Sequence, residues 1–224
     1  MNTRSLDLEA SSSQYAYITD ANQTGLDITG DFTIEFWLKL ETLPPAGTTY
    51  FFVSKDDGST PSRGFGVWMS TNDKKIKCYY FQNNTTLTEA AVGTAFTIDD
   101  VGVWKHIAVA VDVSAKTFNF YINGSSVSST LTASNATSVQ NSAGDFAIGN
   151  VDGQYDTSHN TDGLIDEVRV WNDIRTSTEI ADNYQKELTG GESNLVGYWK
   201  LNNNYLDKTA NGNDLTAVNS PVFS

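Results

Sequence analysis

Paired carboxylates are the first residues of this chain that could do chemistry. Retaining glycoside hydrolysis needs two carboxyl groups about 5–5.5 Å apart, which two acidic residues on one strand face would supply. The sequence holds no Glu-x-Asp-x-Glu pattern. Asp166 and Glu167 are adjacent, so a strand would point them to opposite faces, whereas Asp7 and Glu9 would share one face of a short strand. Glu35 has no second acid beside it. We therefore expect no enzyme activity.

A polar segment from residue 150 to 162 holds the densest set of candidate metal ligands. It contains three aspartates (Asp152, Asp156 and Asp162) together with Asn150 and Asn160. Calcium takes about six to eight oxygen ligands, which carboxylates, asparagine amides and loop carbonyls can supply. The segment therefore predicts a calcium site, with a solvated polar loop as the alternative.

Asp166 is a separate metal candidate. The alternation of its segment places it with Leu164, Val168 and Val170, on the face expected to be buried. A buried carboxylate must be paired or bound to a metal. We therefore expect Asp166 either to hold a structural calcium or to accept hydrogen bonds from loop amides.

Aromatic residues alternate with core-type residues along several segments. If Phe32, Ile34 and Val67 face the core, the opposite face carries Glu35 and a set of aromatic residues: Trp37, Trp68, Tyr79, Phe81 and Tyr121. These side chains could form an exposed binding surface. Alternatively, loops could fold over them and make a second small core.

The composition is that of a folded, acidic domain. Of the 224 residues, 39% are hydrophobic and 12% are aromatic, which is enough for a packed core. The 14 basic and 27 acidic residues give a net charge of −13. This charge argues against nucleic acid and anionic membranes as partners, because both need clustered Lys or Arg. The single cysteine excludes an internal disulfide framework, and no apolar run is long enough to predict a membrane span.

Short strand-like segments separated by Gly, Asn, Asp, Ser and Thr dominate the chain. They are expected near residues 6–8, 15–18, 32–39, 51–54, 65–69, 76–81, 106–111, 118–122, 145–148 and 164–171. Asn123-Gly124 predicts a tight hairpin turn. One helix is expected over Thr176–Leu188, because Thr176 and Glu179 have capping-box spacing and Gly190-Gly191 supplies a stop. This pattern predicts an all-β sandwich of two antiparallel sheets.

Three segments resemble one family. Gly163–Trp171, followed by the predicted helix, resembles the penultimate strand of laminin-G-like domains in the concanavalin A-like lectin/glucanase superfamily, to which pentraxins are related. Asp31–Trp37 resembles its early central strand, and Trp104–Val109 with Phe118–Gly124 resembles its middle hairpin. The resemblance covers most of residues 5–200. It implies a concanavalin A-like jelly roll, with residues 1–224 as a single domain.

The C-terminal stretch, residues 195–224, resembles the strand that usually opens such a domain. It could close this sandwich or open a following repeat. Either possibility implies a longer parent protein, and the first residues show no signal-peptide pattern. We therefore expect neighbouring domains and a location outside the cell or on a cell or virion surface.

The resemblance also implies a function. In this fold the concave face binds glycans by stacking sugar rings on aromatic side chains, which makes Trp68, Tyr79 and Tyr121 candidate ligand-binding residues, with Glu35 as a hydrogen-bonding neighbour. Related domains carry calcium in the loop equivalent to residues 150–162 and at the position of Asp166. The expectation is a non-enzymatic carbohydrate-binding or adhesion module, with calcium as its suspected cofactor and a carbohydrate or glycoprotein surface as its partner.

Two alternatives remain open at this stage. The first is a structural spacer in a tandem surface or phage structural protein, with a structural calcium and no ligand. The second, more remote, is a glycoside hydrolase, because related enzymes share the fold.

Overall fold

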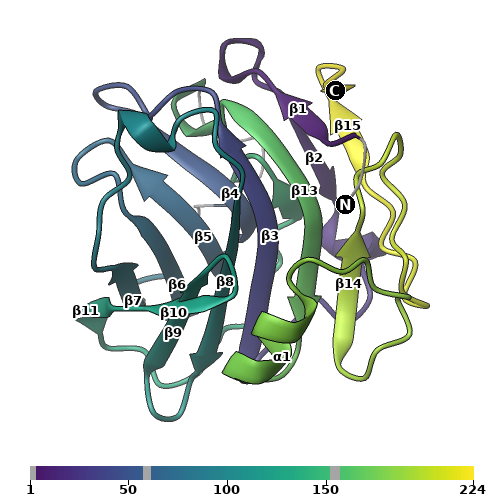
Figure 1. The fold of residues 1–224 in the computed structure, drawn as a ribbon. Coiled ribbons are helices and arrows are strands. Elements are labelled where there is room, and N and C mark those ends of the chain that lie inside the picture. The colour runs from purple at the N-terminus through teal and green to yellow at the C-terminus, as the bar shows by residue number, and fades with distance from the viewer. Residues whose placement is uncertain (1–3, 58–61, 152–156) are drawn as a thin grey trace.

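Two antiparallel sheets of eight strands each face one another in the computed structural model, which describes residues 4–57, 62–151 and 157–224 (Figure 1). The first sheet runs in the order β10 (Ser125–Val127), β9 (Thr117–Ile122), β8 (Lys105–Asp112), β3 (Phe32–Leu40), β13 (Gly163–Trp171), β1 (Leu6–Leu8) and β16 (Val222–Phe223), with β14 (Leu195–Trp199) also paired to β13.

The second sheet runs in the order β11 (Ser129–Ser134), β7 (Thr86–Val92), β6 (Ile76–Asn83), β5 (Phe65–Ser70), β4 (Thr49–Lys55), β12 (Phe146–Ile148), β2 (Tyr15–Ile18) and β15 (Thr216–Val218). In the described residues, four 3₁₀ turns join the strands: η1 (Ala10–Ser12), η2 (Asp20–Asn22), η3 (Ile98–Asp100) and η4 (Thr157–His159). The all-β, two-sheet sandwich expected from the sequence is confirmed.

The core lies between the sheets and follows the predicted alternation. Phe32, Ile34, Phe36 and Leu38 of β3 are all buried in it. The Asn123-Gly124 turn between β9 and β10 has φ values of 51° and 74°, as a type I′ hairpin turn requires.

Strand β13 departs from simple alternation. Glu167 has a φ of 52°, and the register with β3 shifts between Asp166 and Arg169. This β-bulge lets both Ile165 and Val168 enter the core. Asp166 is therefore turned to the outer face, and the expectation that it shares a buried face with Val168 is wrong.

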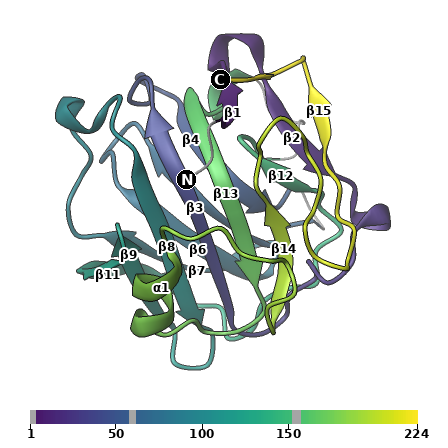
Figure 2. The same ribbon diagram turned by 45° about the vertical axis from the view of Figure 1, so that its right-hand side comes forward.

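One α-helix, α1 (Ser177–Asn183), covers part of the outer face of the first sheet (Figures 1 and 2). Its start was predicted correctly, because Thr176 and Glu179 form the capping box. The helix ends at Asn183, five residues earlier than expected. The carbonyls of Asn183 and Lys186 accept hydrogen bonds from Arg169 of β13, which fixes the following segment against the sheet.

The C-terminal residues pair with strands of both sheets. β14 extends β13, β16 pairs with β1, and β15 pairs with β2 of the second sheet. Ser5 and Ser224 exchange two backbone hydrogen bonds of 3.0 and 3.1 Å, so the two ends of the described chain lie side by side (Figure 1). Among the described residues, no helix is long and apolar enough to cross a membrane.

A buried lysine ties the second sheet to the surrounding loops. The Lys55 ammonium is 1% exposed and lies 2.6 Å from Asp20 and 3.1 Å from Asp27. It also donates to the carbonyls of Ser142 and Gly144, at 2.9 and 2.8 Å. A charge can be buried here because every proton of the ammonium group has an oxygen partner.

Replacing this lysine should destabilise the fold. Lys55→Met leaves two carboxylates and two carbonyls without their shared cation, so we expect the free energy of unfolding to fall by about 3 kcal/mol, measured by urea denaturation. Lys200→Met removes an ion pair with Glu187 that is partly exposed on both sides, and it should cost less than about 1 kcal/mol. Equal losses for the two variants would contradict this account.

Candidate ligand-binding pocket

The predicted aromatic surface does not form as one surface. Trp68 and Tyr79 lie on β5 and β6 of the second sheet, whereas Tyr121 lies on β9 of the first sheet. All three point away from the core, but the outer faces of two stacked sheets face in opposite directions. The expectation that these residues share one binding face is therefore wrong.

Tyr121 is covered rather than exposed. Its side chain is 6% exposed and packs in a small cluster with Ala108, Ala110 and Ile180 of α1. Part of the outer face is thus the second small core that the sequence left open as an alternative.

Trp68 stands beside a shallow groove of about 260 Å³ on the outer face of the second sheet. Its ring is flanked by Phe51 on β4, with ring centroids 5.9 Å apart, and by the Lys77 ammonium on β6, 4.8 Å from the ring centre. Its indole N–H donates to Glu89. The buried Tyr79 hydroxyl donates to Asp56 at 2.8 Å. The Trp68 ring therefore has a neighbour on each of its two flanking strands.

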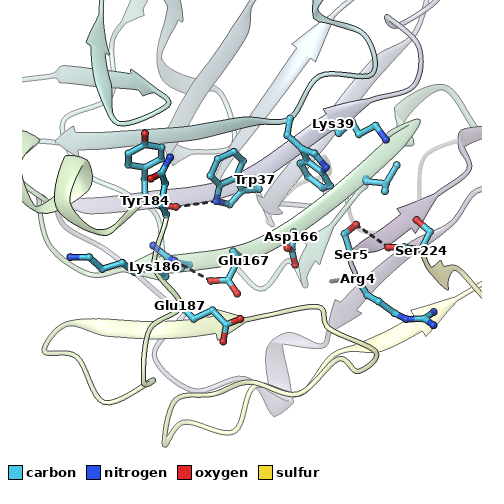
Figure 3. Close-up of a pocket in the computed structure, with 14 residues that line it drawn as sticks. Arg4, Ser5, Trp37, Lys39, Asp166, Glu167, Tyr184, Lys186, Glu187 and Ser224 are labelled. Atoms are coloured by element: carbon cyan, nitrogen blue, oxygen red, sulfur yellow. Dashed lines mark hydrogen bonds and ion pairs between the residues drawn. The ribbon is translucent and has the colours of Figure 1, made fainter. Parts of the chain in front are cut away.

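A better-formed pocket lies on the outer face of the first sheet, among β3, β13 and the segment that follows α1 (Figure 3). We call it the Trp37 pocket. Its volume is about 280 Å³, and its central lining residues are Trp37, Trp104, Tyr184, Lys39, Asp166 and Glu167.

Three aromatic residues form the apolar side of the Trp37 pocket. Trp37 stacks on Tyr184, with ring centroids 6.1 Å apart, and meets Trp104 edge-on at 6.5 Å. The Trp37 indole N–H donates to the Tyr184 carbonyl at 3.0 Å, which fixes the ring. Trp104 is half-buried, and no other ring of the described chain contacts it.

Arg169 forms part of the polar side and is 1% exposed. Its guanidinium donates to Glu167 at 3.0 Å and lies 3.8 Å from Glu35. Burial alone would lower the pKa of Arg169, but the two carboxylates outweigh burial and raise it. The guanidinium therefore stays charged, and the Glu167 carboxylate is held in place by Arg169 and by the Tyr198 hydroxyl at 2.6 Å.

Glu35 lies beneath the pocket and does not line it. It is 2% exposed, accepts a hydrogen bond from Trp171 at 2.7 Å, and lies 3.3 Å from the His106 ring. Burial would raise the pKa of this carboxyl, but His106, Arg169 and Trp171 hold it below its ordinary value. The structure therefore places Glu35 in the support of the pocket, out of reach of a ligand.

Of the four candidate metal ligands, the structure describes Asp162 and Asp166. Asp152 and Asp156 lie outside the described residues. Asp162 uses its carboxylate oxygens to accept from the Ala10 amide at 3.3 Å and the Thr42 hydroxyl at 2.6 Å. Asp166 lines the Trp37 pocket. Asp162 and Asp166 thus line different pockets, and the calcium site over residues 150–162 stays a prediction.

A different acidic group is present at the edge of the first sheet. Asp7, Glu9 and Glu41 place carboxylate oxygens within 4.8 Å of one another. Burial, together with the charges of Asp7, Glu9 and Asp162, raises the pKa of Glu41. The sequence showed that Asp7 and Glu9 share a face, but Glu41 joins them only through the pairing of β1 and β3 with β13.

Two pocket residues escaped the sequence analysis. Trp104 precedes β8, so strand alternation did not assign it to a face. Tyr184 lies within the predicted helix over Thr176–Leu188, which in fact ends at Asn183. The sequence did signal Trp37, which alternation places on the face opposite the core, and it showed that all three residues are large aromatics.

A family profile described as the concanavalin A-like lectin/glucanases superfamily matches residues 10–181. The chain belongs to this laminin-G-type family. A search of curated proteins finds no match.

Several solved structures share the fold. One is a Bacteroides ovatus protein described as a candidate carbohydrate-binding protein, with a TM-score of 0.72 and 16% identity over 100% of this chain. The chain spans 60% of that protein's length. A second is the native heptameric SAP-like pentraxin of Limulus polyphemus, with a TM-score of 0.62 and 10% identity over 99% of this chain and 93% of the pentraxin.

A third is domain 4 of an extracellular GH43 arabinanase from Geobacillus stearothermophilus, in complex with arabinotriose. Its TM-score is 0.51, with 24% identity over 72% of this chain and 69% of that domain. At these identities the three similarities establish the fold, and they include the pentraxin-like fold expected from the sequence.

The lowered pKa of Glu35 predicts how the free energy of unfolding depends on pH. A carboxyl with a lowered pKa in the folded state stabilises the fold at pH values above its ordinary pKa of 4.5, and this contribution is lost as pH falls through the lowered value. Glu35→Gln should therefore be less stable than the wild type at pH 7, and the difference should shrink as pH falls below 4.5. Urea denaturation across pH measures it. A difference that does not change with pH would contradict the assignment.

Proposed function

We propose that this chain is a non-catalytic carbohydrate-binding module and that the Trp37 pocket is its ligand site. The observation that carries the proposal is the pairing of aromatic rings, Trp37 and Trp104, with the polar side chains of Asp166 and Lys39 in one pocket. A sugar has apolar C–H faces that pack on aromatic rings and hydroxyl groups that need hydrogen-bond partners.

The size of the pocket and the net charge of the chain narrow the range of possible ligands. A volume of about 280 Å³ suits one or two sugar units rather than a long internal stretch of polysaccharide. The net charge of −13 disfavours strongly anionic glycans. We infer that the ligand is a neutral saccharide and that the end of a glycan chain, or a short branch of it, inserts into the pocket.

The absence of catalysis is part of the proposal. Glu167 is engaged by both Arg169 and Tyr198, and Glu35 is buried under the pocket. A retaining glycosidase needs two carboxyl groups at its substrate. Of the other acids that line the pocket, Glu187 is paired with Lys200 at 2.8 Å, which leaves Asp166 without a second carboxyl for this chemistry. The similar structures named above support the proposal, since one is described as a candidate carbohydrate-binding protein and another holds arabinotriose.

Trp104 is the residue to test. We expect Trp104→Ala to weaken binding of a neutral oligosaccharide, identified first on a glycan array, by about tenfold or more, because a buried aromatic contact contributes about 1.5–3 kcal/mol. Isothermal titration calorimetry measures the affinity. The matched control is Trp68→Ala on the opposite face, which should leave affinity unchanged.

Two results would count against this assignment. Loss of affinity in Trp68→Ala but not in Trp104→Ala would move the site to the second sheet. No glycan binding by the wild type at all would favour the spacer function instead.

We also propose a calcium cofactor and a location outside the cell, and both remain predictions from the sequence. We expect millimolar calcium to raise the melting temperature over a chelated sample, because a ligand at a hundred times its Kd stabilises the fold by about 2.7 kcal/mol. Asp166→Asn should remove the rise if the ion binds there. An unchanged melting temperature in the wild type would reject a calcium cofactor.

A further inference from the structure

Asn160 is a buried polar side chain without a partner. It is 1% exposed, and neither the oxygen nor the nitrogen of its amide has a hydrogen-bond partner in the described part of the chain. Buried amides are almost always paired, because leaving them unpaired destabilises the fold. This asparagine therefore needs an explanation.

The segment around Asn160 is firmly anchored. The Thr161 amide donates to the Gly149 carbonyl at 2.9 Å, and its hydroxyl donates to the Phe51 carbonyl at 2.7 Å. The Asp162 carbonyl accepts from the Glu41 amide at 3.1 Å. Three hydrogen bonds thus hold the two residues that directly follow the unpaired amide.

Asn160 lines a pocket of about 390 Å³ at one end of the sandwich, and we call this the Asn160 pocket. Its other polar lining includes Asp162, Thr42, Thr48 and Tyr50. Three of them form a hydrogen-bonded row: the Thr42 hydroxyl lies 2.6 Å from the Asp162 carboxylate and 2.7 Å from the Tyr50 hydroxyl. The pocket therefore has a pre-arranged polar wall beside the unpaired amide.

The geometry points to a second binding site for a neutral saccharide in the Asn160 pocket, with the sugar hydroxyls paired to the Asn160 amide. An amide offers one acceptor and two donors, and a hydroxyl group both accepts and donates. A cation would satisfy the amide oxygen and leave the nitrogen unpaired. An anion is disfavoured by Asp162, and no lysine or arginine is among the described lining residues.

This site is independent of the Trp37 pocket. The two pockets share no lining residue, so each can be removed without touching the other. The inference goes beyond the proposed function, which needs only the Trp37 pocket. A chain with two sites would hold a branched or crowded glycan surface more tightly than either site alone.

A stability measurement separates a functional role from a structural one. If Asn160 is kept for a ligand, then Asn160→Leu, of similar size but apolar, removes an unpaired buried amide and should raise the melting temperature while weakening binding. Asn150→Leu is the matched control, because Asn150 is equally buried but its side-chain oxygen accepts from the Val151 amide. That variant should lower the melting temperature.

Binding is measured by ¹H–¹⁵N NMR with D-glucose, D-galactose, D-mannose and L-arabinose as probes, and with calcium chloride in a separate titration. We expect at least one sugar to shift the Asn160 side-chain amide and the Thr48 backbone amide. Asn160→Leu should weaken this response about tenfold, as judged from Thr48. Trp104→Ala should leave the Thr48 response to sugar unchanged, because this substitution alters only the Trp37 pocket.

Three outcomes would overturn the inference. The first is no shift at Asn160 or Thr48 with any of the four sugars. The second is a shift with calcium alone, which would make the pocket a cation site. The third is an Asn160→Leu variant with a lowered melting temperature and unchanged sugar affinity. None of these bears on the Trp37 pocket, so failure here leaves the proposed function standing.

Discussion

The guanidinium of Arg169 is buried on the outer face of the first sheet, where it contacts carboxylates on two strands and carbonyls on the segment after α1. A charge buried to this extent needs oppositely charged and polar groups around it. Both terminal nitrogens of Arg169 donate to such groups, whereas its Nε–H has no hydrogen-bond partner among the described residues. Here those groups come from Glu35 on β3, Glu167 on β13, and the backbone at Asn183 and Lys186. The requirement to pair this one side chain therefore sets the position of the chain after the helix.

The Trp37 pocket follows from that position. Because Arg169 binds the carbonyls at 183 and 186, Tyr184 between them is brought onto Trp37. The bulge at Glu167 completes the arrangement, since it allows two consecutive acidic residues, Asp166 and Glu167, to line the pocket. Side chains that support the fold thus also shape the proposed sugar site, and binding there needs little reorganisation.

The sequence predicted the architecture well because strand alternation, turn residues and the capping box are local signals. It failed at two kinds of position. The left-handed backbone of Glu167 has no local signature, so the strand was read with uniform alternation and Asp166 was assigned to the wrong face. The assignment of Tyr121 and Trp68 to one surface failed because alternation tells inward from outward but does not tell one sheet from the other.

The Trp37 pocket and the Asn160 pocket could not be predicted from the sequence for a related reason. Trp104 and Tyr184 lie outside regular elements, and only the tertiary fold brings them to Trp37. Asn160 was visible as one polar residue of a polar loop. Its burial without a partner, which sets it apart from its neighbours, depends on contacts far away in the sequence.

The central claim is that a neutral glycan packs against the aromatic side of the Trp37 pocket, and the indole N–H resonances of the five tryptophans can test it in one ¹H–¹⁵N NMR titration. Trp68 and Trp199 donate to fixed partners away from the pocket. The account predicts that the Trp104 resonance, and to a lesser degree that of Trp37, shifts with a glycan while those two stay in place. A shift of Trp68 with Trp104 unchanged would contradict it.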